Sequence, residues 1–133
     1  MRLSEEERKA VVDYRIEKAE HSYEEAEKVC SMQLWNIAAN RLYYALYYMS
    51  SALLIHNEKS AHTHSGLLTM IHLHYVKTGL LSYDDGKLLK TLFRMRQEGD
   101  YEDFVEISKD DVEHVMPQTR NLLDKIRGLI KTD

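Results

Sequence analysis

The chain has 133 residues, of which 44% are hydrophobic and 30% are charged, and its formal net charge is −4. This length suits one domain, so we expect residues 1–133 to form a single unit around a hydrophobic core. One proline and five glycines leave few turn signals, which argues against a sandwich or barrel of many short strands. The negative net charge disfavours broad, non-specific binding to nucleic acid but still allows a local basic patch.

Three features of the sequence indicate a cytoplasmic protein. No stretch approaches 18 consecutive apolar residues, so we expect no membrane-spanning helix. Residues 1–10 lack the apolar segment of a secretory signal. The single cysteine, Cys30, excludes an internal disulfide, and we interpret it as a small, half-buried apolar residue in a reducing compartment.

The first predicted helix begins at Ser4. Ser4 and Glu7 have the spacing of a capping box, and the acidic residues of the first turn suit the positive end of the helix dipole. Apolar residues then recur at intervals of three and four: Val12, Ile16, Ala19, Tyr23, Ala26 and Cys30. This pattern predicts a long amphipathic helix with one buried side.

The second predicted helix, residues 33–56, is apolar around most of its circumference and has no acid between Trp35 and Asn57. Such a helix is central in its bundle, shared with a partner chain, or both. It carries four tyrosines: Tyr43, Tyr44, Tyr47 and Tyr48. These could form a platform for stacking bases, but we favour core packing and contact with a second copy, because aromatic side chains dominate buried interfaces.

A third helix is predicted over residues 65–77, after a polar connection. Thr63 or Ser65 can cap its start, and Gly79 can supply the left-handed conformation that ends it. The two His-x-His pairs of the chain lie at residues 62–64 and 72–74, and side chains two apart on a helix point about 200° from each other. We therefore expect no metal site and no cofactor.

The fourth predicted helix, residues 82–98, ends because Gly99 stops it. Residues 100–107 are expected to form a loop in which Phe104 and Val105 point inward. A capping pair starts a last helix, which continues to about residue 130. These elements predict an all-α fold, an antiparallel up-and-down bundle of about five helices.

The last predicted helix contains the only proline of the chain. Ser108 and Asp111 form the capping pair at its start. Pro117 lies inside it, and we expect a kink there that frees the carbonyl of Glu113.

Basic residues recur on the fourth predicted helix. Lys87, Lys90 and Arg94 follow one another at intervals of three and four, and Arg96 comes at the helix end. Cations in the last turn are favourable with the helix dipole whatever their function, so a solvated structural face is one interpretation. Arginines beside a glycine could also bind a phosphate with two hydrogen bonds each. All four are therefore phosphate-binding candidates.

Three motifs, in this order, resemble the HEPN domain family. They are NRLYYALYY at residues 40–48, HSGL at residues 64–67, and RMRQEGDY at residues 94–101. The resemblance extends from about Tyr14 to Ile130. It implies a helical bundle that forms homodimers in the cytoplasm. Family members are commonly paired with a small nucleotidyltransferase of the MNT type in toxin–antitoxin modules.

The resemblance also implies a site. Many family members are metal-independent endoribonucleases in which an arginine is followed, after four to six residues, by a histidine, and the dimer brings these groups together. Here Arg96 has no histidine in that window, and the sequence belongs with Arg-x-x-Gly-Asp-Tyr variants of the motif. Asp100 lies about where the histidine would be, and Tyr101 follows it. The resemblance thus makes Arg96, Asp100 and Tyr101 the positional candidates for a catalytic site.

Two hypotheses of function follow. In the first, the protein is a toxin–antitoxin component that acts as a dimeric partner of an MNT-type nucleotidyltransferase and binds nucleotide or RNA phosphate. In the second, it is a metal-independent endoribonuclease that uses Arg94 and Arg96 with a base from elsewhere, such as His64 or Tyr101. Phosphate binding without chemistry would use the same basic residues.

Overall fold

The computed structural model describes residues 2–103 and 105–131. Within these ranges the chain forms helices and turns and no β-strand, which confirms the expected all-α class. The helices are α1 (Glu5–Ser31), α2 (Trp35–His56), α3 (His64–Ile71), the π-helical segment η1 (His72–Val76), α4 (Tyr83–Tyr101) and α5 (Lys109–Lys131). None of the described helices is long and apolar enough to cross a lipid bilayer.

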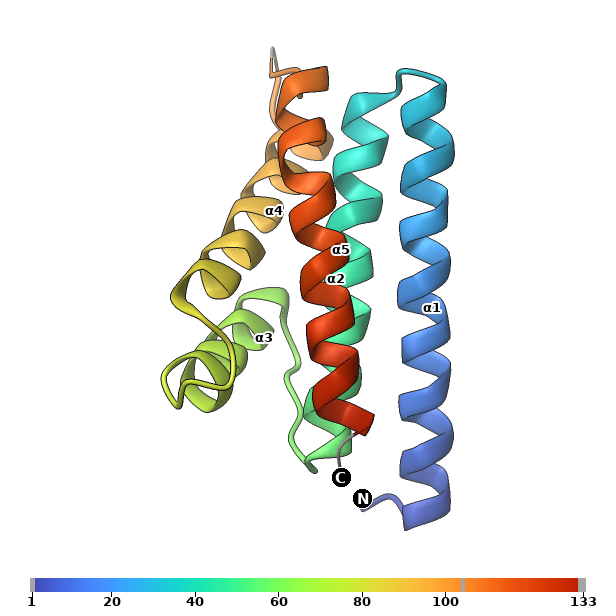
Figure 1. Cartoon of the computed structure of the whole chain (residues 1–133), viewed down its shortest axis with the longest axis vertical. Helices are drawn as coiled ribbons and strands as arrows, with labels where there is room; N and C mark the ends of the chain where they lie inside the picture. Colours follow the sequence, from blue (N-terminus) through green and yellow to red (C-terminus); the bar gives the residue numbers. More distant parts are fainter. Residues whose placement is uncertain (1, 104, 132–133) are drawn as a thin grey trace.

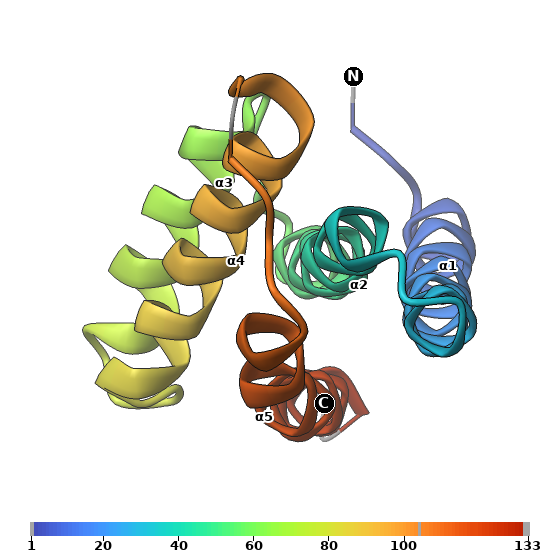
Figure 2. The same ribbon diagram turned by 90° about the horizontal axis from the view of Figure 1, so that it is seen from above.

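Helix α2 lies at the centre of the bundle. α1, α4 and α5 all pack against it, and the four long helices run alternately up and down (Figure 1). The view from above shows α1 and α5 beside α2, with α3 and α4 on the side of α2 opposite α1 (Figure 2). This central position explains the nearly continuous apolar surface of α2. Its fully buried side chains include Leu42, Leu46, Met49 and Leu53.

One side of α2 is left without a covering helix, between α1 and α3 (Figure 2). Ile37 on this side is 48% exposed, and Tyr44, Tyr47 and Tyr48 are only half-buried. The uncovered side is the part of this apolar helix that remains open to another molecule.

Capping boxes fix the starts of α1, α4 and α5, and the sequence predicts those of α1 and α5. In each capping box the serine hydroxyl accepts from the backbone N–H three residues later, and that residue's carboxylate accepts from the serine N–H. Such a cap stabilises a helix by about 1 kcal/mol. The pairs are Ser4 with Glu7, Ser82 with Asp85, and Ser108 with Asp111.

The third helix differs from its predicted form. Thr63 is its cap, with its hydroxyl 2.9 Å from the backbone nitrogen of Gly66, so the helix begins at His64. After Ile71 the helix widens into the π-helical turn η1. Gly79 has a φ of 88°, the left-handed conformation that its position predicts.

The prediction that Gly99 stops the fourth helix is wrong. α4 continues to Tyr101, because the Asn36 side-chain amide donates to the Gly99 carbonyl at 3.3 Å and ties this turn to α2. In the following loop Val105 is half-buried, and Phe104 lies outside the described residues. α5 is helical from Lys109 to Lys131, with Pro117 inside it.

Candidate functional site

The four basic residues of α4 do not share one surface. Lys87 is exposed, and Lys90 lines a cavity beside α3. Arg94 is exposed on the α5 side, where its Nε lies 3.4 Å from Glu98 Oε1. Arg96 is instead 7% exposed and packs against α2. The structure therefore separates Arg96 from the other three phosphate-binding candidates.

The Arg96 guanidinium lies among four aromatic rings. Its Cζ is 5.2 Å from the ring centroid of Tyr43, 5.6 Å from Tyr44, 5.9 Å from Phe93 and 5.4 Å from Tyr101, distances typical of cation–π contact. One terminal nitrogen donates to the Tyr44 hydroxyl at 3.2 Å, and the buried Nε has no hydrogen-bond partner. No carboxylate among the described residues forms an ion pair with this side chain. A buried cation without a counter-charge favours binding of an anion.

His64 contacts the same rings. Because Thr63 caps α3, His64 lies in the first helical turn, with its Nδ1 2.6 Å from the Tyr43 hydroxyl and its ring stacked on Tyr47 at 4.7 Å. Partial burial, and secondarily the positive charge of Arg96, lowers the pKa of the His64 imidazole below its ordinary value. The lowered pKa favours the neutral imidazole, which can accept a proton.

Asp100 is held by α2 and does not pair with Arg96. Its Oδ2 accepts from the Asn40 side-chain amide at 2.8 Å. The Asn40 oxygen in turn accepts two hydrogen bonds from Arg41, at 3.1 Å and 2.8 Å, and Arg41 forms an ion pair with Glu25 at 3.1 Å. This polar chain fixes the end of α4 on α2, and Asp100 forms no ion pair with Arg96.

The four tyrosines of α2 divide between core and surface. Tyr43 is fully buried, and burial raises its pKa well above the usual range. Tyr44, Tyr47 and Tyr48 contact one another at centroid distances of 5.5–5.8 Å and lie on the uncovered side of α2. We call these three residues the tyrosine face. At the edge of this face, the Nζ atom of Lys18 in α1 lies over the Tyr48 ring, 4.7 Å from its centroid.

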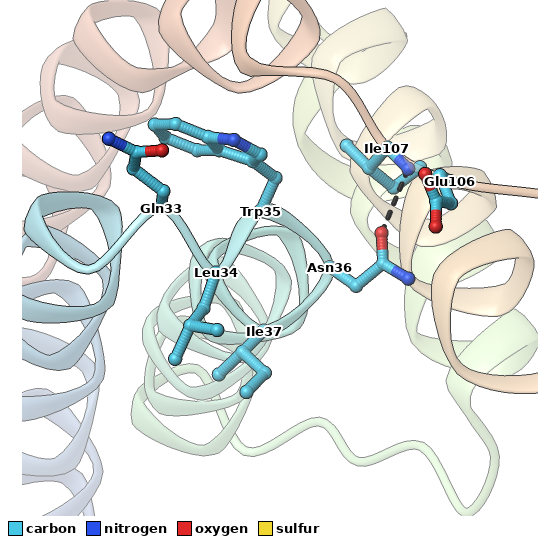
Figure 3. A pocket seen from close by; sticks show the side chains of 7 residues that line it. All are labelled: Gln33, Leu34, Trp35, Asn36, Ile37, Glu106 and Ile107. Carbon is cyan, nitrogen blue, oxygen red and sulfur yellow. Dashed lines mark hydrogen bonds between the residues drawn. The ribbon is translucent and has the colours of Figure 1, made fainter.

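A cavity of about 330 Å³ lies where the α1–α2 turn meets the segment before α5 (Figure 3). Asn36 points to this segment, and its side-chain oxygen accepts from the Ile107 N–H at 2.8 Å. Leu34 and Ile37 point away from that contact (Figure 3). The cavity contains no part of the Arg96 and His64 cluster, and Asn36 serves there to hold the segment that follows α4.

The cluster around Arg96 combines a cation without a counter-charge, a neutral imidazole and several aromatic rings. Among the described residues, no group of three His, Cys, Asp or Glu side chains is placed to hold a metal ion. A phosphodiester could bind the guanidinium while the imidazole removes a proton from a nearby hydroxyl. The sequence offers His64, in the HSGL motif, as one of two alternative bases, and the structure brings it to the rings around Arg96.

The fold and this cluster define a helical-bundle domain with a buried arginine on its fourth helix. Residues 12–129 match the HEPN domain. The chain belongs to the HEPN domain family, which confirms the resemblance that the three motifs indicate.

Related proteins cover most of the chain. It is 32% identical over 125 residues to a UPF0332 protein of Thermotoga maritima, covering 94% of this chain and 95% of the relative. It is 31% identical to the protein of Methanocaldococcus jannaschii named "Putative toxin MJ0142", covering 84% of this chain and 76% of the relative. A second protein of that organism, named "Putative toxin MJ0605", is 24% identical, with 87% of this chain and 86% of the relative covered.

Proposed function

We propose that this HEPN protein is a toxin-type homodimer that cleaves RNA at Arg96 and His64 without a metal ion. The observation that carries the proposal is that both groups contact Tyr43, His64 through a 2.6 Å hydrogen bond and Arg96 over the ring at 5.2 Å. His64 then replaces the histidine that is missing after Arg96. The toxin names of two relatives support the biological class.

The chemistry follows from the two groups. When Nδ1 carries the proton and donates to Tyr43, the other ring nitrogen of His64 is free to accept the proton of a ribose 2′-hydroxyl. The 2′-oxygen then forms a bond to phosphorus, and the bond from phosphorus to the 5′-oxygen breaks, while water supplies a proton to the departing oxygen. Arg96 stabilises the extra negative charge on the phosphoryl oxygens in the transition state. The products carry a 2′,3′-cyclic phosphate and a 5′-hydroxyl.

The dimer in this proposal forms through the tyrosine face. Its three side chains are only half-buried in the single chain, and aromatic side chains are enriched in protein interfaces. Within this face, the Tyr44 hydroxyl accepts a hydrogen bond from Arg96, and the Tyr47 ring stacks on His64. Contact between two copies here would therefore place both catalytic clusters next to the interface.

The test is cleavage of a labelled RNA by the purified protein in EDTA. We expect fragments with cyclic phosphate ends, loss of cleavage in Arg96→Gln and His64→Gln, and retained cleavage in the matched control His114→Gln, which changes an exposed histidine of α5. If Arg96→Gln cleaves as well as the parent protein, a contaminating nuclease explains the activity and the proposal fails.

A nucleotidyltransferase of the MNT type is the second part of the proposal, as the partner that controls this protein. The toxin names of the relatives favour it, because a toxin requires a partner that holds it in check. Tyr101 is 72% exposed next to Arg96, so a bound partner can reach the candidate site. The gene to co-express is the neighbouring open reading frame. We expect its product to co-purify with this protein as a stable complex. A nucleotidyltransferase from that locus that does not bind this protein would contradict the pairing.

A further inference from the structure

A cavity of about 680 Å³ lies between α3, η1 and α4, outside the cluster of Arg96 and His64. Ser65 and His72 line it from α3 and η1, Lys77 lies at the end of η1, and Lys90 faces it from α4. Leu73 contributes an apolar side chain that is 47% exposed. We call this cavity the α3–α4 groove. The two helices are neighbours in the bundle (Figure 2).

The α3–α4 groove begins where the candidate site ends. Ser65 directly follows His64 in the first turn of α3. On α4, Phe93 lies one turn beyond Lys90, and its ring is nearly parallel to that of His64, with 8° between the planes and 6.4 Å between the centroids. A linear ligand bound at His64 can therefore continue along the groove.

The charge of the groove suits a polyanion. Its lining contains two lysines and a histidine and no carboxylate. Neither Lys77 nor Lys90 forms an ion pair with an acid among the described residues. Leu68 and Leu73 lie between the polar residues of the lining. Lysines along a groove contact the phosphates of a nucleic-acid backbone, which is the electrostatic part of single-strand binding.

We infer that the α3–α4 groove binds the single-stranded RNA that flanks the bond cleaved at His64 and Arg96. The inference rests on the proposed ribonuclease function, because the strand enters the groove from that site. From His64 to Lys77 the groove extends about 20 Å along the helix axis, which accommodates several nucleotides. Lys77 and Lys90 bind backbone phosphates there, so the groove holds the strand without reading its sequence.

The experiment measures the affinity of the full chain for 2′-O-methyl RNA, whose attacking hydroxyl is blocked, as a trinucleotide and as a dodecanucleotide. The groove variant is Lys77→Gln with Lys90→Gln. The matched control is Lys28→Gln with Lys109→Gln, which removes two exposed lysines from α1 and α5. Fluorescence anisotropy at several salt concentrations gives the affinity and its salt dependence.

We expect the groove variant to bind the dodecanucleotide roughly tenfold more weakly at about 0.15 M salt, since two phosphate contacts are lost. The slope of log affinity against log salt should become shallower by about 1.4. Binding of the trinucleotide should weaken much less than that of the dodecanucleotide, and the cleavage rate of a short unmodified RNA at saturation should be unchanged. The control should bind both RNAs as the parent protein does.

Two results separate failure of the groove from failure of the site. If the groove variant binds the dodecanucleotide as the control does, while Arg96→Gln abolishes cleavage, the groove assignment is wrong and the proposed function stands. If the parent protein binds the dodecanucleotide through the lysines but never cleaves RNA, the groove stands as a binding surface and the ribonuclease proposal fails.

Discussion

The Nδ1 atom of His64 and the hydroxyl oxygen of Tyr43 lie 2.6 Å apart, which joins the first turn of α3 to the buried side of α2. Tyr43 is fully buried, and its ring also lies 5.2 Å from the Arg96 guanidinium. Tyr43 therefore orients the His64 imidazole and also packs against the Arg96 guanidinium. This relationship gives the first prediction.

Tyr43→Phe keeps the ring and removes the hydroxyl, so we expect the His64 imidazole to lose its fixed orientation. The cleavage rate at saturating RNA should fall about ten- to hundredfold, because small misplacement of a catalytic group is costly. RNA affinity should change little, since Arg96 keeps its ring contacts. Unfolding in urea should show a loss of about 1 kcal/mol for the missing hydrogen bond.

The control for this variant is Tyr23→Phe. The Tyr23 hydroxyl lies 3.5 Å from the Met116 carbonyl oxygen, on the side of the bundle where α1 meets α5. Its removal should leave the cleavage rate unchanged. Equal rates for Tyr43→Phe and the parent protein would show that the hydroxyl does not position His64.

The second prediction concerns the pKa of His64, which burial and then the positive charge of Arg96 lower below 6.5. In Arg96→Gln the charge is gone and only the effect of burial remains, so the pKa of His64 should rise. NMR titration of the imidazole signal measures this directly. Arg94→Gln is the matched variant, because Arg94 is on the α5 side of the same helix and pairs with Glu98. An equal pKa of His64 in Arg96→Gln and the parent protein would contradict the electrostatic coupling.

The same pKa fixes the sign of the pH dependence of cleavage. The neutral imidazole is the base, so the rate should fall as the pH drops through the pKa of His64 and level off above it. Because this pKa is lowered in the folded protein, the midpoint of the fall should lie below 6.5. A rate that rises as the solution becomes more acidic would exclude His64 as the base.

The third prediction concerns Asn40, which holds Asp100 at 2.8 Å. Asn40→Ala should release the last turn of α4, so backbone amides at residues 99–101 should exchange hydrogen faster in mass-spectrometric measurements. The lost hydrogen bond to a carboxylate should reduce the free energy of unfolding by about 1–2 kcal/mol. Asn121→Ala, at an exposed position of α5, is the control. Unchanged exchange at the end of α4 would show that the contact with Asn36 alone holds this turn.

The helices could be predicted from the sequence because their signals are local. Ser4 with Glu7, and Ser108 with Asp111, combine a capping pair with apolar residues at helical spacing, and both signals act within a few residues. The end of α4 could not be predicted in this way. Gly99 alone indicates that the helix ends there. In the structure the Gly99 carbonyl accepts a hydrogen bond from Asn36, a residue far away in the sequence, and α4 continues to Tyr101.

The candidate site was only partly predictable for the same reason. Its arginine and its histidine were both named from motifs, but their meeting depends on α3 folding back against α4. The grouping of Arg96 with Arg94 was less well founded, since residues two apart on a helix point to different sides. The structure buries Arg96 against the tyrosines of α2 and leaves Arg94 exposed.

The fourth prediction tests the tyrosine face as the dimer contact. Tyr48 lies on this face and makes no contact with Arg96, so Tyr48→Glu adds a charge to the proposed interface without touching the guanidinium. Lys18 lies 4.7 Å above the Tyr48 ring and can pair with the new carboxylate, so the single chain should stay folded. Light scattering after size exclusion should show a dimer for the parent protein at micromolar concentration and a monomer for the variant.

The matched control is Tyr83→Glu, which introduces the same charge at a tyrosine that is 75% exposed at the start of α4. This control should remain dimeric. Circular dichroism should give the same helix content for both variants, which separates loss of the dimer from loss of the fold. A carboxylate cannot be buried between two copies of an apolar face without a large free-energy cost. A Tyr48→Glu variant that stays dimeric would therefore place the interface elsewhere. A parent protein that is monomeric at micromolar concentration would remove the dimer from the proposal.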